Sequence, residues 1–156
     1  MTDPIIEAAR GALADGFDTL RRAAEGLPAE ALNWRPAGDE TNSIAVLTTH
    51  AAHATRLLLH LVAALPLPPR DRPAEFVATA DGPGPLLHLV DTLGAECLAV
   101  LDSVGEVEWA GRRQRGRDGG EIVEMSAAGA LIKAVTHLRG HADEAALTRH
   151  MWLARS

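Results

Sequence analysis

The chain has 156 residues, a formal net charge of −6, and 47% hydrophobic residues. This length fits a single domain over residues 1–156 that buries its own core, and the one cysteine, Cys97, excludes an internal disulfide. The acidic balance disfavours a general role in nucleic-acid binding. No stretch approaches the roughly 18–20 consecutive apolar residues of a membrane span, and the acidic start does not resemble a secretory signal. We therefore expect a cytoplasmic protein.

The first predicted helix covers residues 4–25. Asp3 is a good N-cap, Pro4 suits the first helical position, and apolar residues follow at spacings of three and four. Residues 27–42 read as a loop whose one large side chain is Trp34.

A second helix is predicted over residues 43–65, capped by Asn42 or Ser43. Its apolar residues keep alternating spacings of three and four: Ile44, Leu47, Ala51, Ala54, Leu58, Leu61 and Leu65. Prolines stop it, and residues 66–84 are expected to be irregular, with at most a short turn between 73 and 79.

A third helix is predicted over residues 85–104, with Cys97 in its apolar stripe. We interpret Cys97 as a small core residue, because no flanking residue would lower the pKa of its thiol. Residues 105–125 suggest a short hairpin, since 106–109 and 121–124 flank a glycine-rich turn. The basic run from Arg112 to Arg117 between them is interpreted as a solvated loop rather than an anion site.

The fourth helix is predicted over residues 127–153, with Ser126 as its cap. Four long amphipathic helices without alternating strands indicate an all-α fold, a four-helix bundle.

The seven histidines separate by their angle around each helix, since every residue turns about 100°. His50 lies about 65° from the centre of its apolar stripe, and His141 and His137 lie about 30° and 70° from the centre of theirs. These three are predicted to face the bundle interior. The other four are predicted to face water: His53, His60, His88 and His150.

His137 and His141 are four residues apart, so their imidazoles stack on one helical face. With His50 from another helix they provide three nitrogen ligands and leave one position open, as in catalytic zinc sites. Three ordinary histidines in a non-catalytic bundle that binds a ligand or a partner helix remain the alternative. The ring nitrogen of each histidine that does not bind the metal would donate a hydrogen bond to a nearby acceptor. The candidates for this acceptor are Glu144, Asp143 and Asp91.

The chain resembles the DinB-like, or YfiT-like, superfamily. The matching residues are 32–36 (Leu-Asn-Trp-Arg-Pro), 42–45 (Asn-Ser-Ile-Ala) leading to His50, then 137–144 and Arg149. The resemblance implies a bacterial four-helix bundle with up-down-down-up topology. It also implies that His50, His137 and His141 bind a divalent transition metal: zinc, with nickel or iron as alternatives.

The activities that the resemblance implies are mostly thiol-dependent S-transfer, with bacillithiol, mycothiol or glutathione as co-substrate, and a mycothiol-dependent isomerisation. One position departs from the family pattern, because Glu144 stands where a glutamine is common. We therefore expect a metal-dependent thiol S-transferase acting on a small electrophile, with metal-dependent hydrolysis as the alternative. A small-molecule substrate is the expected partner, and a homodimer is compatible with the alanine-rich faces.

The mouth of such a site would be lined by Trp34, Trp109 and the arginines of 112–117. Arg35 or Arg149 could hold a substrate carboxylate. For all of these residues we favour a structural role, as loop anchors or surface charges.

Overall fold

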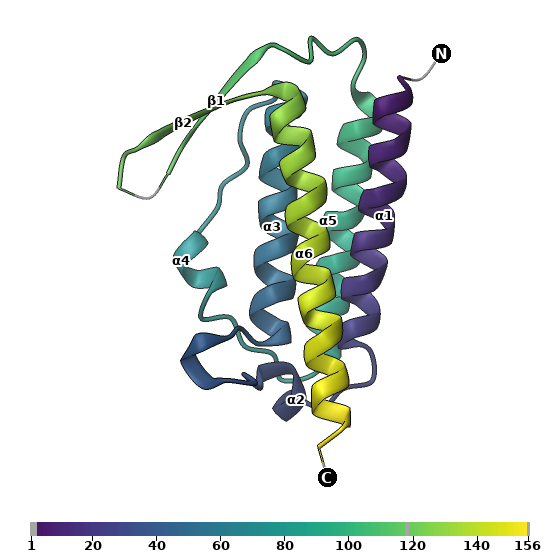
Figure 1. The fold of residues 1–156 in the computed structure, drawn as a ribbon, viewed down its shortest axis with the longest axis vertical. Helices are drawn as coiled ribbons and strands as arrows, with labels where there is room; N and C mark the ends of the chain where they lie inside the picture. The colour runs from purple at the N-terminus through teal and green to yellow at the C-terminus, as the bar shows by residue number, and fades with distance from the viewer. Residues whose placement is uncertain (1–2, 118, 156) are drawn as a thin grey trace.

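The computed structural model describes residues 3–117 and 119–155. Four long helices form the body of the molecule (Figure 1): α1 (Pro4–Ala24), α3 (Ile44–Val62), α5 (Pro83–Ser103) and α6 (Ala127–Leu153). Helix α6 packs against α1 and α3, and α5 packs against the same two helices from the other side. The mainly helical fold predicted from the apolar spacing is therefore present.

Each of three long helices begins at a side-chain cap that the sequence predicted. Asp3 accepts a hydrogen bond from the Ile5 amide at 2.8 Å. Ser43 accepts from the Val46 amide at 3.2 Å, and Ser126 accepts from the Gly129 amide at 3.0 Å. These bonds satisfy amides that a helix leaves unpaired at its start, and they set the starts of α3 and α6, which carry the inward histidines.

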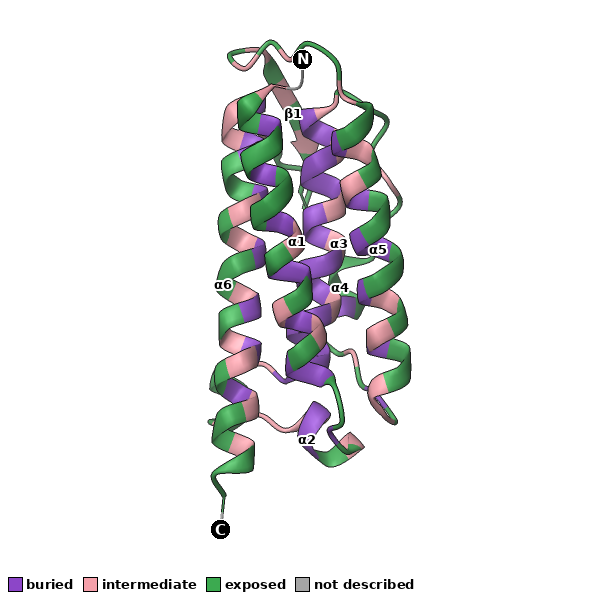
Figure 2. Ribbon diagram, turned by 90° about the vertical axis from the view of Figure 1, so that its right-hand side faces the viewer, coloured by how far each residue is buried: buried purple, intermediate pink, exposed green. Residues whose placement is uncertain are grey.

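Helix α3 is the most deeply buried helix of the bundle. Figure 2 shows it buried over most of its surface, and its leucines at positions 47, 58, 59 and 61 are almost completely enclosed. It ends at Val62, earlier than predicted, where Ala64 adopts a positive φ of 53°.

The other long helices bury most of α3, and the connection of residues 63–82 adds to this burial on the outer side, where it contacts His50 and His60. It runs back along the outside of α3 and includes one helical turn, α4 (Arg72–Glu75) (Figure 1). Asn33 holds its far end, because the side chain donates to the Ala80 carbonyl at 2.8 Å and accepts from the Ala80 amide at 2.9 Å. Apart from α4 the connection is irregular and largely exposed, as expected, and its one helical turn lies at 72–75, at the start of the range expected for a turn.

The expected loop of residues 27–42 also has regular structure. It contains the short helix α2 (Ala29–Asn33) and a 3₁₀ turn (Gly38–Glu40). Leu27, Ala31 and Leu32 from this segment close one end of the core.

A hairpin joins α5 to α6, as the glycine-rich turn suggested. Its antiparallel strands are β1 (Arg112–Gly116) and β2 (Ile122–Ser126), with Arg115 opposite Val123. The first strand is therefore the basic run and not residues 106–109, which corrects both the strand position and the interpretation of this run as a loop. Arg113 anchors the hairpin, because its guanidinium donates to the Leu61 carbonyl at 2.7 Å and to the Val62 carbonyl at 3.3 Å.

Helix α5 is the one helix in the described residues whose length and composition meet the criteria for a membrane span. Core helices meet the same criteria, and the apolar stripe of α5 packs in the core: Leu86, Val90, Leu93, Cys97 and Leu101. Burial raises the pKa of the Cys97 thiol to about 12, which agrees with its interpretation as a core residue.

Candidate metal centre

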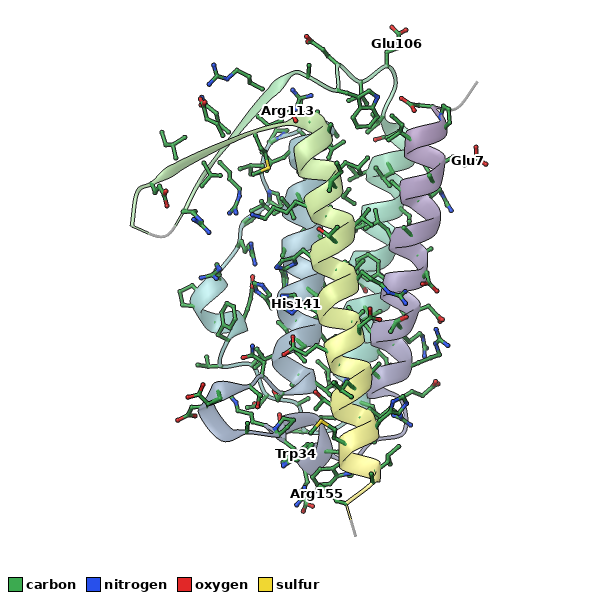
Figure 3. All side chains as sticks on the ribbon, in the orientation of Figure 1. Glu7, Trp34, Glu106, Arg113, His141 and Arg155 are labelled. Atoms are coloured by element: carbon green, nitrogen blue, oxygen red, sulfur yellow. The ribbon has the colours of Figure 1, made fainter. Side chains whose placement is uncertain are left out.

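The structure brings the three inward histidines together at one point between α3 and α6. One ring nitrogen of each histidine lies within 4.8 Å of those of the other two: His50, His137 and His141. The Nε2 atoms of His50 and His137 are 3.2 Å apart. His141 lies near the middle of the bundle (Figure 3), and its ring centroid is 4.5 Å from that of His137 and 5.1 Å from that of His50.

This donor set fits a divalent transition metal. Two nitrogens that share a tetrahedral ion at about 2.0–2.1 Å lie about 3.3 Å apart, close to the 3.2 Å between His50 and His137. His137 Nδ1 is buried and has no hydrogen-bond partner among the described residues, so no protein acceptor competes for this ring. Neutral imidazoles of this kind suit zinc, nickel and iron.

His50 is held in place by a buried ion pair from the connection. Its Nδ1–H donates to Glu75 Oε2 at 2.8 Å. Arg70 donates to both carboxylate oxygens of Glu75, at 2.6 and 2.8 Å. Glu75 is 4% exposed.

Burial opposes the ionisation of Glu75, but hydrogen bonds from His50 and Arg70 outweigh it and hold the pKa of Glu75 below its usual value. An ionised Glu75 can only accept hydrogen bonds, so it fixes the proton of His50 on Nδ1. The lone pair of His50 Nε2 then points toward the other two histidines.

The two histidines of α6 differ in their surroundings. Burial, and after it the electrostatic influence of the neighbouring His141, His50, Arg70 and Lys133, lowers the pKa of His137 to about 3. His137 is therefore neutral near pH 7, with a lone pair available for a metal. His141 Nδ1 lies 3.3 Å from Glu144 Oε2.

Of the three acceptors predicted for the spare ring nitrogens, Glu144 alone lies beside one of these histidines among the contacts described. Asp143 pairs with Arg139 at 3.2 Å, and Asp91 pairs with Arg21 at 3.1 Å.

The remaining histidines lie outside this cluster. His88 and His150 are exposed, as predicted. His53 and His60 were predicted to face water, but both are half-buried. The connection covers that side of α3, and His60 Nδ1 lies 2.7 Å from the Pro66 carbonyl oxygen. Burial also lowers the pKa of His53.

The predicted inward face of α6 is largely present, with Ala130, Ala134, Leu138 and Ala145 buried, but it differs at the position of His141. Ala142 occupies the core position and is fully buried, whereas the His141 side chain is 25% exposed. His141 therefore lies at the edge of the stripe that faces α3, rather than near its centre.

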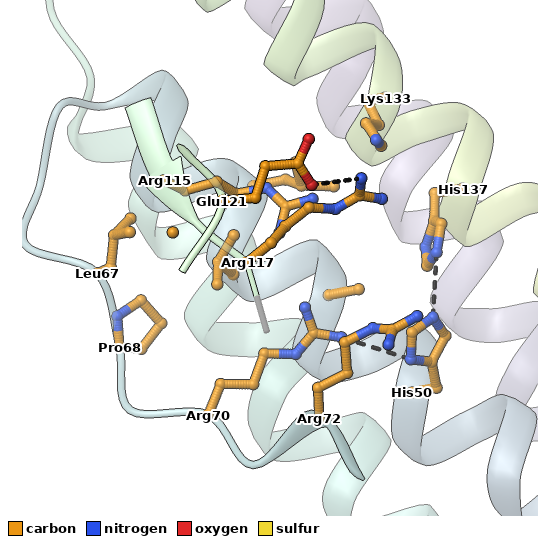
Figure 4. A pocket seen from close by; sticks show the side chains of 14 residues that line it. His50, Leu67, Pro68, Arg70, Arg72, Arg115, Arg117, Glu121, Lys133 and His137 are labelled. Carbon is orange, nitrogen blue, oxygen red and sulfur yellow. Dashed lines mark hydrogen bonds and ion pairs between the residues drawn. The ribbon is translucent and has the colours of Figure 1, made fainter. Parts of the chain in front are cut away.

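A cavity of about 630 Å³ lies against His50 and His137. Figure 4 shows the charged side chains that reach it from the connection, the hairpin and α6: Arg70, Arg72, Arg115, Arg117, Glu121 and Lys133. Leu57, Leu58 and Leu67 add apolar lining. Arg115 and Arg117 of the basic run therefore line the cavity, while Arg112 and Arg117 also pair with Glu124 and Glu121, in agreement with the interpretation of the run as surface charge.

The other residues considered for the mouth have structural roles. Trp34 packs edge-on against Trp152 at 5.6 Å, near the end of α6 (Figure 3). The Trp109 indole donates to Asp3 at 3.0 Å.

The two arginines considered for substrate carboxylates bind backbone carbonyls instead. Arg35 donates to the Phe76 carbonyl at 3.3 Å, and Arg149 donates to the Glu25 carbonyl at 2.6 Å.

Two residues of the centre, Arg70 and Glu75, were missed by reasoning from the sequence. Asp71 before Pro73 is a helix-start signal, and the Asp71 side chain does cap α4 by accepting from the Ala74 amide at 3.1 Å. That signal predicts the turn of α4. No spacing in the sequence relates Glu75 to His50, because the contact depends on how the connection folds back.

Comparison with known proteins gives one family and several similar solved structures, of which two are described here. The family model of the DinB superfamily matches residues 12–145. A crystal structure of a conserved protein from Enterococcus faecalis aligns with a TM-score of 0.68 at 15% identity, over 99% of each chain. A histidine-to-alanine mutant of mycothiol-dependent maleylpyruvate isomerase aligns with a TM-score of 0.61 at 16% identity, over 88% of this chain and 59% of the isomerase. No curated protein matches.

Proposed function

The chain belongs to the DinB superfamily, and we propose that it is an enzyme that uses a divalent metal held by His50, His137 and His141. The observation that carries this proposal is the meeting of three imidazole nitrogens within 4.8 Å, from two helices and beside a cavity. Zinc is the metal we expect, with nickel or iron as alternatives.

We propose that the reaction is transfer of a low-molecular-weight thiol, of the mycothiol or bacillithiol type, to a small electrophile. A bound divalent ion would favour the thiolate form of a thiol at neutral pH. The transfer forms a carbon–sulfur bond, the thiol loses its proton, and the leaving group departs with the bonding electrons. The similar fold of a mycothiol-dependent isomerase is consistent with a thiol co-substrate.

The side chains around the centre have defined tasks in this proposal. Glu75 keeps the proton of His50 on Nδ1, and Arg70 keeps Glu75 ionised. The cavity admits the substrates beside His50 and His137. The chain supplies no thiol of its own here, because Cys97 lies on α5 in the core and burial raises its pKa to about 12.

The first test is elemental analysis of the protein purified without a histidine tag. We expect about one divalent metal per chain, and loss of that metal in each of the variants His50→Ala, His137→Ala and His141→Ala. His88→Ala and His150→Ala are matched controls, because both side chains are exposed. Unchanged metal content in the three ligand variants would contradict the proposed metal site.

The second test separates transfer from hydrolysis. Candidate thiols are supplied with monochlorobimane, and formation of the fluorescent thioether is followed with and without each thiol. The proposal expects a metal-dependent rate that rises with thiol concentration and disappears in His137→Ala. Turnover that is independent of added thiol would favour hydrolysis instead.

Three broader expectations belong to the same proposal. A thiol co-substrate suits a reducing compartment, so the cytoplasm remains the predicted location. The up-down-down-up order is supported by the return of the chain along α3 between residues 63 and 82 (Figure 1). A homodimer also remains a prediction.

A further inference from the structure

The connection of residues 63–82 contacts His50 through two successive side chains. Glu75 Oε2 accepts a hydrogen bond from His50 Nδ1 at 2.8 Å. The ring of Phe76 lies beside the imidazole, with 4.6 Å between the two ring centroids. One nitrogen and one side of the His50 ring are therefore occupied by the connection, so the direction of this imidazole depends on where residues 75 and 76 lie.

The connection cannot fix that position by its own structure. It is irregular apart from the single turn of α4, and one helical turn is not stable alone, because starting a helix fixes several residues for one hydrogen bond. The ion pair of Arg70 with Glu75 joins two residues of the same segment. The place of the segment in the molecule must therefore come from contacts with other parts of the chain.

Asn33 and Arg35 provide two such contacts. Arg35 donates to the Phe76 carbonyl at 3.3 Å, directly after the residue that accepts from the imidazole. Asn33 donates to the Ala80 carbonyl at 2.8 Å and accepts from the Ala80 amide at 2.9 Å. Its side chain also donates to the Ala29 carbonyl at 2.9 Å, so both the donor and the acceptor of this amide are used and its orientation is fixed.

Trp34, which lies between them, attaches the same stretch to the helix that carries the other two histidines. Its backbone is extended, with φ −71° and ψ 136°, and successive residues of an extended chain point to opposite sides. The Trp34 ring packs against Trp152 of α6 at 5.6 Å (Figure 3). Residues 33–35 thus link the connection, which supports His50, to α6.

We propose that Asn33 and Arg35 are positioning residues of the candidate metal centre. They hold the connection so that Glu75 stays in place as the acceptor of His50. The proton of His50 then remains on Nδ1, and the lone pair of Nε2 remains directed at the metal. This inference deepens the proposed function and rests on it, because it names what keeps the geometry of that site.

The test is a double-mutant cycle on metal affinity, measured by competition with a chromophoric chelator. Arg35→Gln is too short to reach the Phe76 carbonyl and should weaken metal binding about threefold to tenfold, less than the loss of Glu75 itself. Because Arg35 acts through Glu75, the same substitution should change the affinity less than about twofold in a protein that already carries Glu75→Gln. Asn33→Ala should behave in the same way.

Arg149→Gln is the matched control. Arg149 also donates to backbone carbonyls, those of Ala23 at 3.3 Å and Glu25 at 2.6 Å, but it joins α6 to the end of α1 instead of to the connection. Its loss should lower the unfolding temperature and leave metal affinity unchanged. Arg35→Gln should, in addition, alter the visible absorption spectrum of the protein loaded with Co²⁺.

Three results would overturn the inference. The first is equal metal affinity of Arg35→Gln and the wild type. The second is an equal loss of affinity in Arg35→Gln and Arg149→Gln, which would indicate a general effect of stability. The third is full additivity of Arg35→Gln with Glu75→Gln, which would show that Arg35 does not act through Glu75.

A measurement on the metal-free protein separates this inference from the proposed function. Nitrogen NMR of the chain with labelled histidine reports which ring nitrogen of His50 carries the proton. The wild type should hold it on Nδ1, and Arg35→Gln should show a mixture of both tautomers. An unchanged tautomer in that variant would contradict the inference. A chain that binds no metal and yet shows this change would contradict the proposed function alone.

Discussion

At the scale of single residues, the buried carboxylate of Glu75 is the contact that most controls the centre. Glu75→Gln should lower metal affinity by about 10- to 100-fold, the usual effect of losing a carboxylate behind a metal-bound histidine. The neutral amide no longer fixes the proton of His50 on Nδ1, and it leaves the charge of Arg70 without its partner. Competition with a chromophoric chelator measures the change.

The control for this variant is Glu96→Gln. Glu96 also pairs with an arginine, Arg56, at 2.8 Å, but it is partly exposed and lies on α5. Its loss should leave metal affinity unchanged. A Glu75→Gln protein that folds and binds metal as tightly as the wild type would show that His50 needs no carboxylate support.

Cys97 provides a second prediction at this scale, through the pH dependence of stability. Its pKa is raised from 9.0 to about 12 in the folded protein, so unfolding favours the thiolate at high pH. This stabilisation is fully present below pH 9 and is lost as the pH rises toward 12. At pH 10.5 the loss amounts to about 2 kcal/mol.

Urea unfolding at pH 7 and pH 10.5 should therefore show a larger loss of stability for the wild type than for Cys97→Ala. Other groups titrate equally in both proteins, so the difference isolates Cys97. Cys97→Ala should also retain thiol-dependent turnover. A parallel loss of stability in the two proteins would contradict the raised pKa.

At the scale of elements, the contact between α1 and α6 depends on a glycine. A Cβ atom at Gly16 would lie 2.9 Å from the side chain of Leu138, which is fully buried. Gly16→Ala should therefore destabilise the protein by about 1–3 kcal/mol through overpacking. The same substitution at Gly11, an exposed position of α1 with no atom within 4 Å, should stabilise it by up to about 1 kcal/mol. Thermal unfolding of both variants checks the opposite signs.

The four long helices could be predicted because each contains apolar residues at helical spacing, which is visible in the sequence. Ser43 and Ser126 marked two starts correctly. The connection could not be predicted in this way. Its position depends on distant contacts, such as those of Asn33 with Ala80 and of Arg70 with Glu75. For the same reason the half-burial of His53 and His60 was missed.

The candidate site also combines residues that could be predicted from the sequence with residues that could not. His50, His137 and His141 could be selected because each lies near an apolar stripe of a regular helix. Arg115 and Arg117 were considered for the mouth of the site only together with all the arginines of 112–117, since the direction of each side chain depends on the register of the hairpin. The alternation of side chains along β1 shows which residues share a face, but it can be used only once the bounds of the strand are known.

At the scale of the whole molecule, metal binding should stabilise the fold. The proposed ligands come from two helices, so an ion that binds only the folded chain shifts the unfolding equilibrium toward the native state. At a free metal concentration one hundred times its Kd the gain is about 2.7 kcal/mol. Calorimetric melting with and without a chelator should show this gain in the wild type and no gain in His137→Ala.

The predicted homodimer can be tested by measuring the mass of the protein in solution. Light scattering coupled to size-exclusion chromatography should give a mass twice the 16.5 kDa of one chain. A mass that stays at one chain over the accessible concentration range would contradict the prediction.

The hairpin has a consequence for how such a protein can diversify. Its outward residues, such as Arg112 and Ile122, are exposed, and exposed positions of this kind tolerate substitution with little loss of stability. The three histidines lie on α3 and α6 and therefore do not belong to these tolerant positions of the hairpin. A duplicated gene could therefore change the outer charges of the hairpin while the three histidines stay intact. The hairpin can therefore vary in sequence while α3 and α6 keep the three histidines.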